Sequence, residues 1–173
     1  MGITTTFVVV VMLLLLSSCG GKQKAMGEAI TERDSLPVMT TLGVTTLISD
    51  SGVTRYRVNT EEWMMYDRKK PSYWAFEKGV YMEQFDSIFN VEASIKADTA
   101  YYYDKERLWK LIGNVDIQNR KGERFNTELL YWNEATQKVY SDKFIRIQQP
   151  DRIITGHGFD SNQQMTIYTI RNI

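Results

Sequence analysis

The sequence predicts an all-β fold built from repeated strand–turn–strand units, and three observations predict it. β-branched and aromatic residues dominate from Val38 onward, turn-forming residues recur at short regular spacing, and the segments between them alternate apolar with polar residues. Alternation with a period of two is typical of a strand that has one buried and one solvated face. The turn signals lie at residues 50–52, 70–72, 104–106, 120–122, 133–134, 149–151 and 160–162.

The first part of the chain predicts membrane targeting. Residues 7–16 form an apolar run of ten residues, which fits the core of a signal peptide and is shorter than the ~20 residues that cross a bilayer. Small residues then precede Cys19, as in the lipobox of bacterial lipoproteins, where the cysteine is diacylated and becomes the new N-terminus. Cys19 is the only cysteine, so no intrachain disulfide explains its place. We therefore predict a signal peptide at residues 1–18; the alternative is an uncleaved anchor in which Cys19 stays an ordinary thiol.

Residues 19–37 predict a lipidated, flexible tether. They are polar, carry charges of both signs and are poor in aromatic residues. Fully extended, the tether reaches roughly 60 Å, so the folded domain at residues 38–173 can stand clear of the membrane. Two acyl chains on one cysteine hold a protein on a membrane far more firmly than one chain does.

The strands are assigned in order from the alternation between the turns. Residues 54–58, 111–117 and 144–148 alternate with a period close to two, so each predicts a strand with one apolar face. Residues 60–67 are the exception, because Thr60 could cap a short helical turn that carries two acidic residues near its start. That stretch stays open between a helical turn and an irregular strand.

An internal repeat links the central strands. Tyr102 aligns with Tyr131 at an offset of 29 residues, and the same offset places Val115 on Phe144. Each repeat is a strand–turn–strand unit that cannot bury its apolar face alone. Stacked units therefore predict a sandwich or roll with a continuous interior.

Composition and the available side chains argue against nucleic-acid binding, a metal site and the common kinds of catalytic site. The 21 basic residues balance the 21 acidic ones and the pI is about 6.6, which argues against nucleic-acid binding. His157 is the only histidine and sits between two glycines, so it predicts a solvated residue in a turn or a bulge and leaves no second histidine for a zinc site. Glu61 with Glu62, and Glu123 with Glu128, predict solvated surface rather than glycosidase-type carboxylates. The chain also lacks the glycine-rich phosphate loop of nucleotide hydrolases, and we predict no catalytic residue, no metal and no cofactor.

A resemblance to a known family comes from five segments of the domain, residues 51–57, 94–100, 108–117, 125–131 and 154–160. Their order and spacing resemble those of the LptC family of periplasmic lipopolysaccharide-export proteins. The resemblance implies a twisted, slightly open β-jellyroll, OstA-like in type, whose interior holds the acyl chains of lipopolysaccharide. It also implies two protein partners: an inner-membrane ABC transporter that extracts the lipid with ATP, and the next β-jellyroll of a trans-periplasmic bridge.

The chain differs from the best-known members of that family at its N-terminus. Those members carry an uncleaved transmembrane helix, whereas this chain carries a lipobox at Cys19, which puts helix-mediated control of the transporter in doubt. Residues 20–22 contain no acidic side chain. We expect the protein to stay on the periplasmic side of the inner membrane, lipid-anchored through Cys19.

The predicted lipid groove follows from strand alternation. Four Trp, ten Tyr and seven Phe allow an oily interior that side chains fill only in part. A one-residue slip of register would move every candidate to the other face. The alternative is a structural or adhesive surface lipoprotein with a packed β-sandwich, and binding of lipopolysaccharide separates the two. The candidates for the groove are Trp109, Leu111, Val115, Ile117, Leu129, Tyr131, Ile145 and Ile147.

Overall fold

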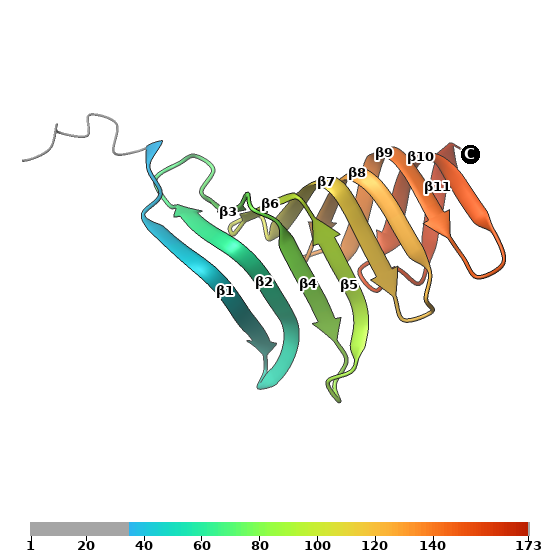
Figure 1. Ribbon diagram of the computed structural model, residues 1–173, viewed down its shortest axis with the longest axis horizontal. Coiled ribbons are helices and arrows are strands. Elements are labelled where there is room, and N and C mark those ends of the chain that lie inside the picture. Colours follow the sequence, from blue (N-terminus) through green and yellow to red (C-terminus); the bar gives the residue numbers. More distant parts are fainter. Residues whose placement is uncertain (1–34, 173) are drawn as a thin grey trace, which may run out of the picture. The chain divides into compact units, whose positions relative to one another are not determined.

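The computed structural model describes residues 35–172, and its elements are all β-strands (Figure 1). The eleven strands pair antiparallel in one sheet, which confirms the predicted all-β fold. Within the described residues, no helix is long and apolar enough to cross a membrane. The predicted signal peptide, Cys19 and residues 20–34 of the predicted tether lie outside the described part.

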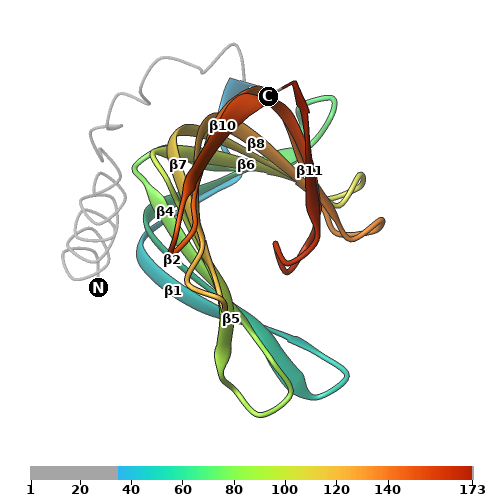
Figure 2. The same cartoon turned by 90° about the vertical axis from the view of Figure 1, so that its right-hand side faces the viewer.

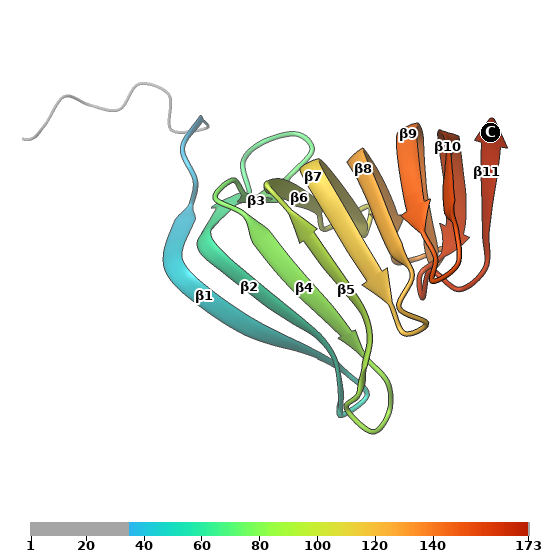
Figure 3. The same ribbon diagram turned by 45° about the vertical axis from the view of Figure 1, so that its right-hand side comes forward.

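The strands follow one another in series from β1 at one end of the sheet to β11 at the other (Figure 3). They are β1 (Met39–Asp50), β2 (Val53–Tyr66), β3 (Tyr73–Phe76), β4 (Val80–Phe85), β5 (Val91–Ala97), β6 (Thr99–Tyr103), β7 (Leu108–Asn119), β8 (Arg124–Asn133), β9 (Lys138–Gln148), β10 (Ile153–Asn162) and β11 (Tyr168–Asn172). The sheet order is β11-β10-β9-β8-β7-β5-β4-β2-β3-β6, with β1 also paired to β2 and β6 also paired to β7.

The short strands β3 and β4 lie end to end along β2, and the short strands β5 and β6 lie end to end along β7. β2 pairs with β4 through residues 56–60 and with β3 through residues 64–66. β7 pairs with β6 through residues 108–112 and with β5 through residues 116–119. β3 and β4 therefore continue one another across the sheet, as do β5 and β6.

The long strands bend at a shared corner. β7 takes left-handed backbone at Gly113 (φ 77°) and Asn114 (φ 44°), which makes a bulge opposite β8. Register shifts follow between β8 and β9, from Thr127 to Tyr131, and in β10 at Gly158 (φ 78°). Bulges bend a strand and increase its twist, so each long strand enters two half-sheets that face one another (Figure 2).

We call the two half-sheets layer 1 and layer 2. Layer 1 contains β3, β6, β11 and residues 62–66, 108–112, 129–133, 138–141 and 159–162 of the long strands. Layer 2 contains β4, β5 and residues 53–60, 115–119, 124–127, 145–148 and 153–156.

The core lies between the two layers. Tyr56 of layer 2 contacts Trp132 of layer 1, with ring centroids 5.2 Å apart. Phe125 of layer 2 lies 5.7 Å from Phe159 and 5.2 Å from Tyr168 of layer 1. Burial of one such side chain contributes about 1.5–3 kcal/mol, so these contacts hold the roll closed. The largest fully buried side chains are Phe125, Phe159, Leu111, Ile117, Leu130, Ile145, Ile147, Met165, Val115, Val139 and Ser141.

The stretch that the sequence left open is strand, because β2 extends through residues 60–66. Thr60 Oγ1 donates to the carbonyl of Gly79 at 2.8 Å. Trp63 packs against the buried core. Burial of this ring on a sheet outweighs the local helical signal, since strand preference depends mainly on packing.

The predicted turn at residues 160–162 is wrong. β10 continues through Asn162, and the turn lies at residues 163–167. The side-chain oxygen of Asn162 accepts hydrogen bonds from the backbone N–H groups of Thr166 (2.9 Å) and Ile167 (3.1 Å). The turn-forming residue therefore closes the loop that follows the strand, as Asn side chains commonly do.

The repeat has a period of 30 residues and not the predicted 29. Val115 and Ile145 are both fully buried, whereas Phe144, the predicted equivalent of Val115, is 49% exposed. Arg107 (φ 50°) and Gln137 (φ 55°) take the same left-handed position in the β6–β7 and β8–β9 turns. The sequence indicates 29 because Tyr102 matches Tyr131 by residue type, whereas a period of 30 brings Tyr102 onto the neighbouring Trp132.

Candidate functional site

Six of the eight predicted groove residues lie on the inner face between the layers. Trp109 is almost fully buried and the other five are completely buried. β7 keeps Leu111 and Val115 on one face although its bulge lies between them, because the two positions are four residues apart. The six residues are Trp109, Leu111, Val115, Ile117, Ile145 and Ile147.

The predicted placement of Leu129 and Tyr131 on the inner face is wrong. Leu130 and Trp132 occupy that face instead and are buried. Tyr131 stacks on a tyrosine of β9 across the outer face, with ring centroids 5.2 Å apart. β8 changes face at its irregular segment, because Thr127 and Leu130 are both buried yet only three positions apart.

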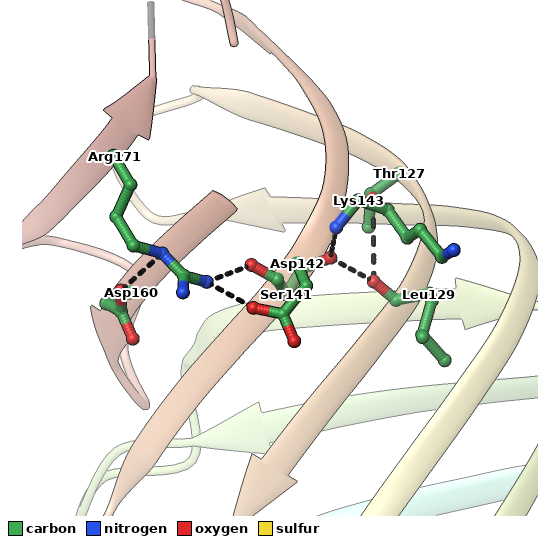
Figure 4. Close-up of polar contacts among 7 residues, drawn as sticks. All are labelled: Thr127, Leu129, Ser141, Asp142, Lys143, Asp160 and Arg171. Carbon is green, nitrogen blue, oxygen red and sulfur yellow. Dashed lines mark hydrogen bonds and ion pairs between the residues drawn. The ribbon is translucent and has the colours of Figure 1, made fainter. Parts of the chain in front are cut away.

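Polar side chains hold the backbone of this irregular segment (Figure 4). Ser141 Oγ donates to the carbonyl of Leu129 at 2.6 Å, and Thr127 Oγ1 donates to the carbonyl of Phe144 at 2.8 Å. The backbone N–H of Lys143 donates to Ser141 Oγ at 3.1 Å. A buried hydroxyl needs a partner and often takes a backbone group, so these two polar residues at inward positions are the sequence signal that locates the bulge.

Aromatic rings form a continuous wall on the inner face of layer 1, with neighbouring centroids 4.7 to 6.3 Å apart. Trp109 Nε1 and the Tyr102 hydroxyl both donate to the Glu134 carboxylate, at 2.9 and 3.3 Å. Burial, followed by the charge of Glu134, raises the pKa of Tyr102 to about 12. Glu134 thus anchors two polar atoms of the wall, whereas Nε1 of Trp63 and Nε1 of Trp132 are buried with no hydrogen-bond partner in the described part of the chain. The members of the wall are Trp63, Trp74, Phe76, Tyr102, Trp109 and Trp132.

The groove is open beside β1, β2 and β4 and filled toward β11. Ile48 is 38% exposed and lies opposite Tyr56 on the inner face. Tyr56 also borders a narrow apolar slot that continues to Trp132 and Met165, where only about 20 Å³ is unfilled. At the open end a recess of about 560 Å³ separates the turns of the two layers; its lining includes Ile48, Asp50, Arg55, Tyr56, Arg107, Glu134, Gln163 and Gln164.

Comparison with known protein families decides the class of this protein. A family model described as "Lipopolysaccharide-assembly, LptC-related" matches residues 7–172. The chain belongs to the LptC family. The match spans the whole bent sheet, confirms the resemblance seen in the sequence, and identifies the roll as the β-jellyroll of a periplasmic component of lipopolysaccharide transport. No curated protein matches the chain.

This LptC jellyroll has a free strand at each end of the bend. Among the strands of residues 35–172, β1 pairs only with β2, and β11 pairs only with β10. Arg171 of β11 reaches across Gly158 of β10 to the Ser141 carbonyl (2.6 Å) and the Asp142 carboxylate (2.8 Å) of β9 (Figure 4). A Cβ at position 158 would lie 2.7 Å from Arg171 Nε, so glycine is needed there to let Arg171 staple the end strand.

The ionisable residues that the sequence analysis set aside have structural contacts of their own. His157 is exposed and packs edge-on against Phe144, with centroids 5.4 Å apart. Glu62 forms an ion pair with Lys78 at 3.0 Å, and Glu123 accepts hydrogen bonds from two amide side chains at 2.7 Å. Among residues 35–172, no group of three His, Cys, Asp or Glu side chains is placed to hold a metal ion. The family is one of transport components, and the contacts of these residues suit a structural role.

Proposed function

We propose that this protein receives lipopolysaccharide from an inner-membrane, ATP-driven extractor and passes it to the next β-jellyroll of a periplasmic bridge, with the acyl chains held between layers 1 and 2. The observation that carries the proposal is the open end of the groove. There Ile48 of β1 and Tyr56 of β2 lie on the inner face and are reachable from solvent, in a recess whose other lining residues are mostly polar. That face leads directly to the aromatic wall through the slot at Trp132.

The energetics favour a lined channel for this cargo. A lipid chain of about 12–14 carbons costs on the order of 10 kcal/mol to expose to water, at ~0.8 kcal/mol per CH₂. An inner face of aliphatic side chains and ring faces removes most of that cost, because the chain exchanges one apolar surrounding for another. The groove set that we propose for lipid contact is Trp109, Leu111, Val115, Ile117, Leu130, Trp132, Ile145 and Ile147.

The free strands supply the joints of the bridge. Unpaired strand edges pair readily with the edge of another sheet. Pairing at β1 and at β11 would place the interior of this roll in line with the interior of its neighbours. In this proposal one edge meets the extractor and the other meets the next jellyroll, and backbone hydrogen bonds join the grooves end to end.

The membrane attachment is part of the same proposal. We assign residues 1–18 to a signal peptide, Cys19 to a lipidated N-terminus and residues 20–37 to the tether that holds the jellyroll at the periplasmic side of the inner membrane. Mass spectrometry of the mature protein tests this directly. The N-terminal peptide should begin at a diacylated Cys19, and an intact Met1 or an unmodified Cys19 would contradict the assignment.

Photo-crosslinking in living cells tests the groove with a matched pair of positions. Ile48 and Leu47 are adjacent in β1, but Ile48 faces the interior opposite Tyr56 whereas Leu47 lies on the outer face opposite Arg57. We expect a lipopolysaccharide adduct from a crosslinker at position 48 and none at position 47. Leu47 is the more exposed of the two, at 55% against 38%, so indiscriminate contact would favour the wrong position. If neither position captures lipid while the protein is folded and abundant, the packed-sandwich alternative replaces the proposal.

A further inference from the structure

The loop between β10 and β11, residues 163–167, lies across the groove between the two layers, and Gln163 and Gln164 line the same recess as Ile48 of β1. It starts from layer 1, where its first residue donates a backbone hydrogen bond to Gln137 of the β8–β9 turn at 3.1 Å. In Figure 2 the loop lies at the lower end of β11, turned toward the middle of the curled sheet. Met165 at its centre is 1% exposed and belongs to the core between the layers. One short loop therefore bridges the two layers.

The side-chain hydrogen bonds from layer 2 to the backbone of the loop come from the end of β7 and the β7–β8 turn. Asn119 Nδ2 donates to the carbonyl of Met165 at 2.8 Å and to the carboxylate of Glu123 at 2.7 Å. Lys121 Nζ donates to the carbonyl of Thr166 at 3.5 Å. Asn119 is itself buried, so this turn is shaped to hold the loop.

The start of β11 is tied to layer 2 through the same carboxylate. Glu123 Oε1 accepts hydrogen bonds from Gln149 Nε2 at 2.7 Å and from the Tyr168 hydroxyl at 3.2 Å. Burial acts to raise the pKa of Glu123, but the hydrogen bonds from Asn119, Gln149 and Tyr168 outweigh it and leave that pKa below its ordinary value. The carboxylate is therefore charged and fully engaged when the loop is closed.

The loop keeps its own shape independently of layer 2. Asn162 accepts from the backbone of Thr166 and Ile167 through its side chain, and its carbonyl accepts from the backbone N–H of Met165 at 3.0 Å. Ser161 Oγ donates to the carbonyl of Ile167 at 3.0 Å. These bonds lie within the hairpin, so they persist if the loop moves away as a unit.

The side chain of Met165 stands where a lipid chain would pass. Only about 20 Å³ is unfilled beside it, which is room for about one water molecule. Trp132 borders the same slot, and its indole N–H is buried with no hydrogen-bond partner in the described part of the chain. Buried donors are normally paired, so a ligand carbonyl in this slot would satisfy a group that the closed loop leaves unpaired.

We propose that residues 163–167 form a gate: Met165 plugs the groove in this structure, and the loop lifts from layer 2 when an acyl chain of the cargo takes its place. The gate rests on the proposed function, since it regulates the same groove. The polar ties to Asn119 and Lys121 suit this role, because water replaces them when the loop opens. The apolar contact of Met165 is replaced by the acyl chain.

A reversible lock on the gate provides the test. Lys121→Cys and Thr166→Cys, made together in a full-length chain with Cys19→Ser, place one thiol on the turn and one on the loop. A reducible bifunctional thiol reagent joins them, and fluorescently labelled lipopolysaccharide is then titrated onto the protein. We expect the locked protein to load little lipid and reduction of the reagent to restore loading to the level of the unlinked protein.

A second pair of variants tests the gate without a crosslink. Met165→Ala removes most of the plug and Asn119→Ala removes the tie, whereas Asn126→Ala, which deletes a hydrogen bond to Asp116 on the outer face, is the control. If the closed gate is populated about 90% of the time, opening it tightens the apparent affinity by about tenfold. We expect that gain for the two gate variants and none for the control.

The outcomes separate the two proposals. If the unlinked protein binds the labelled lipopolysaccharide but the lock and the gate variants leave loading unchanged, the gate is wrong and the groove stands. If the unlinked protein itself fails to bind the probe, and position 48 yields no adduct in cells, the proposed function fails and the gate fails with it.

Discussion

Adjacent leucines in β8 provide the sharpest test of the structure. Leu130 is completely buried between the layers, whereas Leu129 points to the outer face. Leu→Ala in a rigid core costs about 2–5 kcal/mol, from lost transfer energy and from the cavity that remains. We expect about 3 kcal/mol for Leu130→Ala, because its neighbours belong to two bonded strands that cannot collapse into the gap. Leu129 is half-buried on the outer face, so Leu129→Ala should cost clearly less, about 1 kcal/mol.

Urea unfolding of the full-length variants, followed by tryptophan fluorescence, measures both values. All four tryptophans lie in the β-domain, so the signal reports the fold itself. A loss of about 3 kcal/mol corresponds to a fall in melting temperature of about 9 °C for a domain of this size. The slope of the transition should not change, since the surface exposed on unfolding is nearly the same. If Leu129→Ala is as costly as Leu130→Ala, the reasoning about the β8 register is refuted.

Three further predictions concern stability. Gly113→Ala should lower the free energy of unfolding by more than about 1 kcal/mol, and by more than Gly122→Ala does. Both glycines have a positive φ, but of the two only a Cβ at position 113 would meet a side chain, 2.8 Å from Asp98 Oδ2. Thermal denaturation compares the two variants. Glu123 has a lowered pKa in the folded state, so its contribution to the free energy of unfolding is present above the ordinary carboxyl pKa and is lost as the pH falls through the folded pKa. Glu123→Gln should therefore flatten the acid side of a curve of stability against pH. An unchanged acid side would contradict the assignment. Burial raises the pKa of Tyr102 to about 12, so its contribution to the free energy of unfolding is complete below the ordinary pKa of about 10 and is lost as the pH rises to 12. Tyr102→Phe should reduce this loss of stability at alkaline pH. Absorbance at high pH follows the titration of the tyrosine, and unfolding at several pH values follows the stability.

Much of the fold could be predicted because the local signals agree with the tertiary structure. Turn residues at 50–52, 104–106, 120–122 and 149–151 lie where the chain reverses, since glycine, proline, asparagine and aspartate supply the turn geometry whatever lies around them. β7 and β9 alternate cleanly in their outer thirds, and their inward residues are predictable for that reason.

The β8 register could not be predicted from alternation, because the information lies in backbone irregularity. The strand changes face between Thr127 and Leu130, and a period-two pattern carries no sign of such a change unless the buried hydroxyls are read as partners for backbone groups. The true period of 30 residues was hidden for a different reason, because Tyr102 matches Tyr131 by residue type although the period brings it onto the neighbouring Trp132.

The gate answers a problem that any lipid-carrying β-roll faces. A groove able to hold acyl chains is an apolar surface that would attract other proteins when empty, and a free end strand adds an unpaired edge. In this chain the interior near β11 is covered from within, because Met165 fills the slot beside Trp132 and the β7–β8 turn holds it there. Near β1 the interior stays open. In the function and gate that we propose, cargo that enters through the recess beside Ile48 has to displace Met165 before it reaches the part of the groove toward β11, so the contacts that protect the empty groove also control its loading.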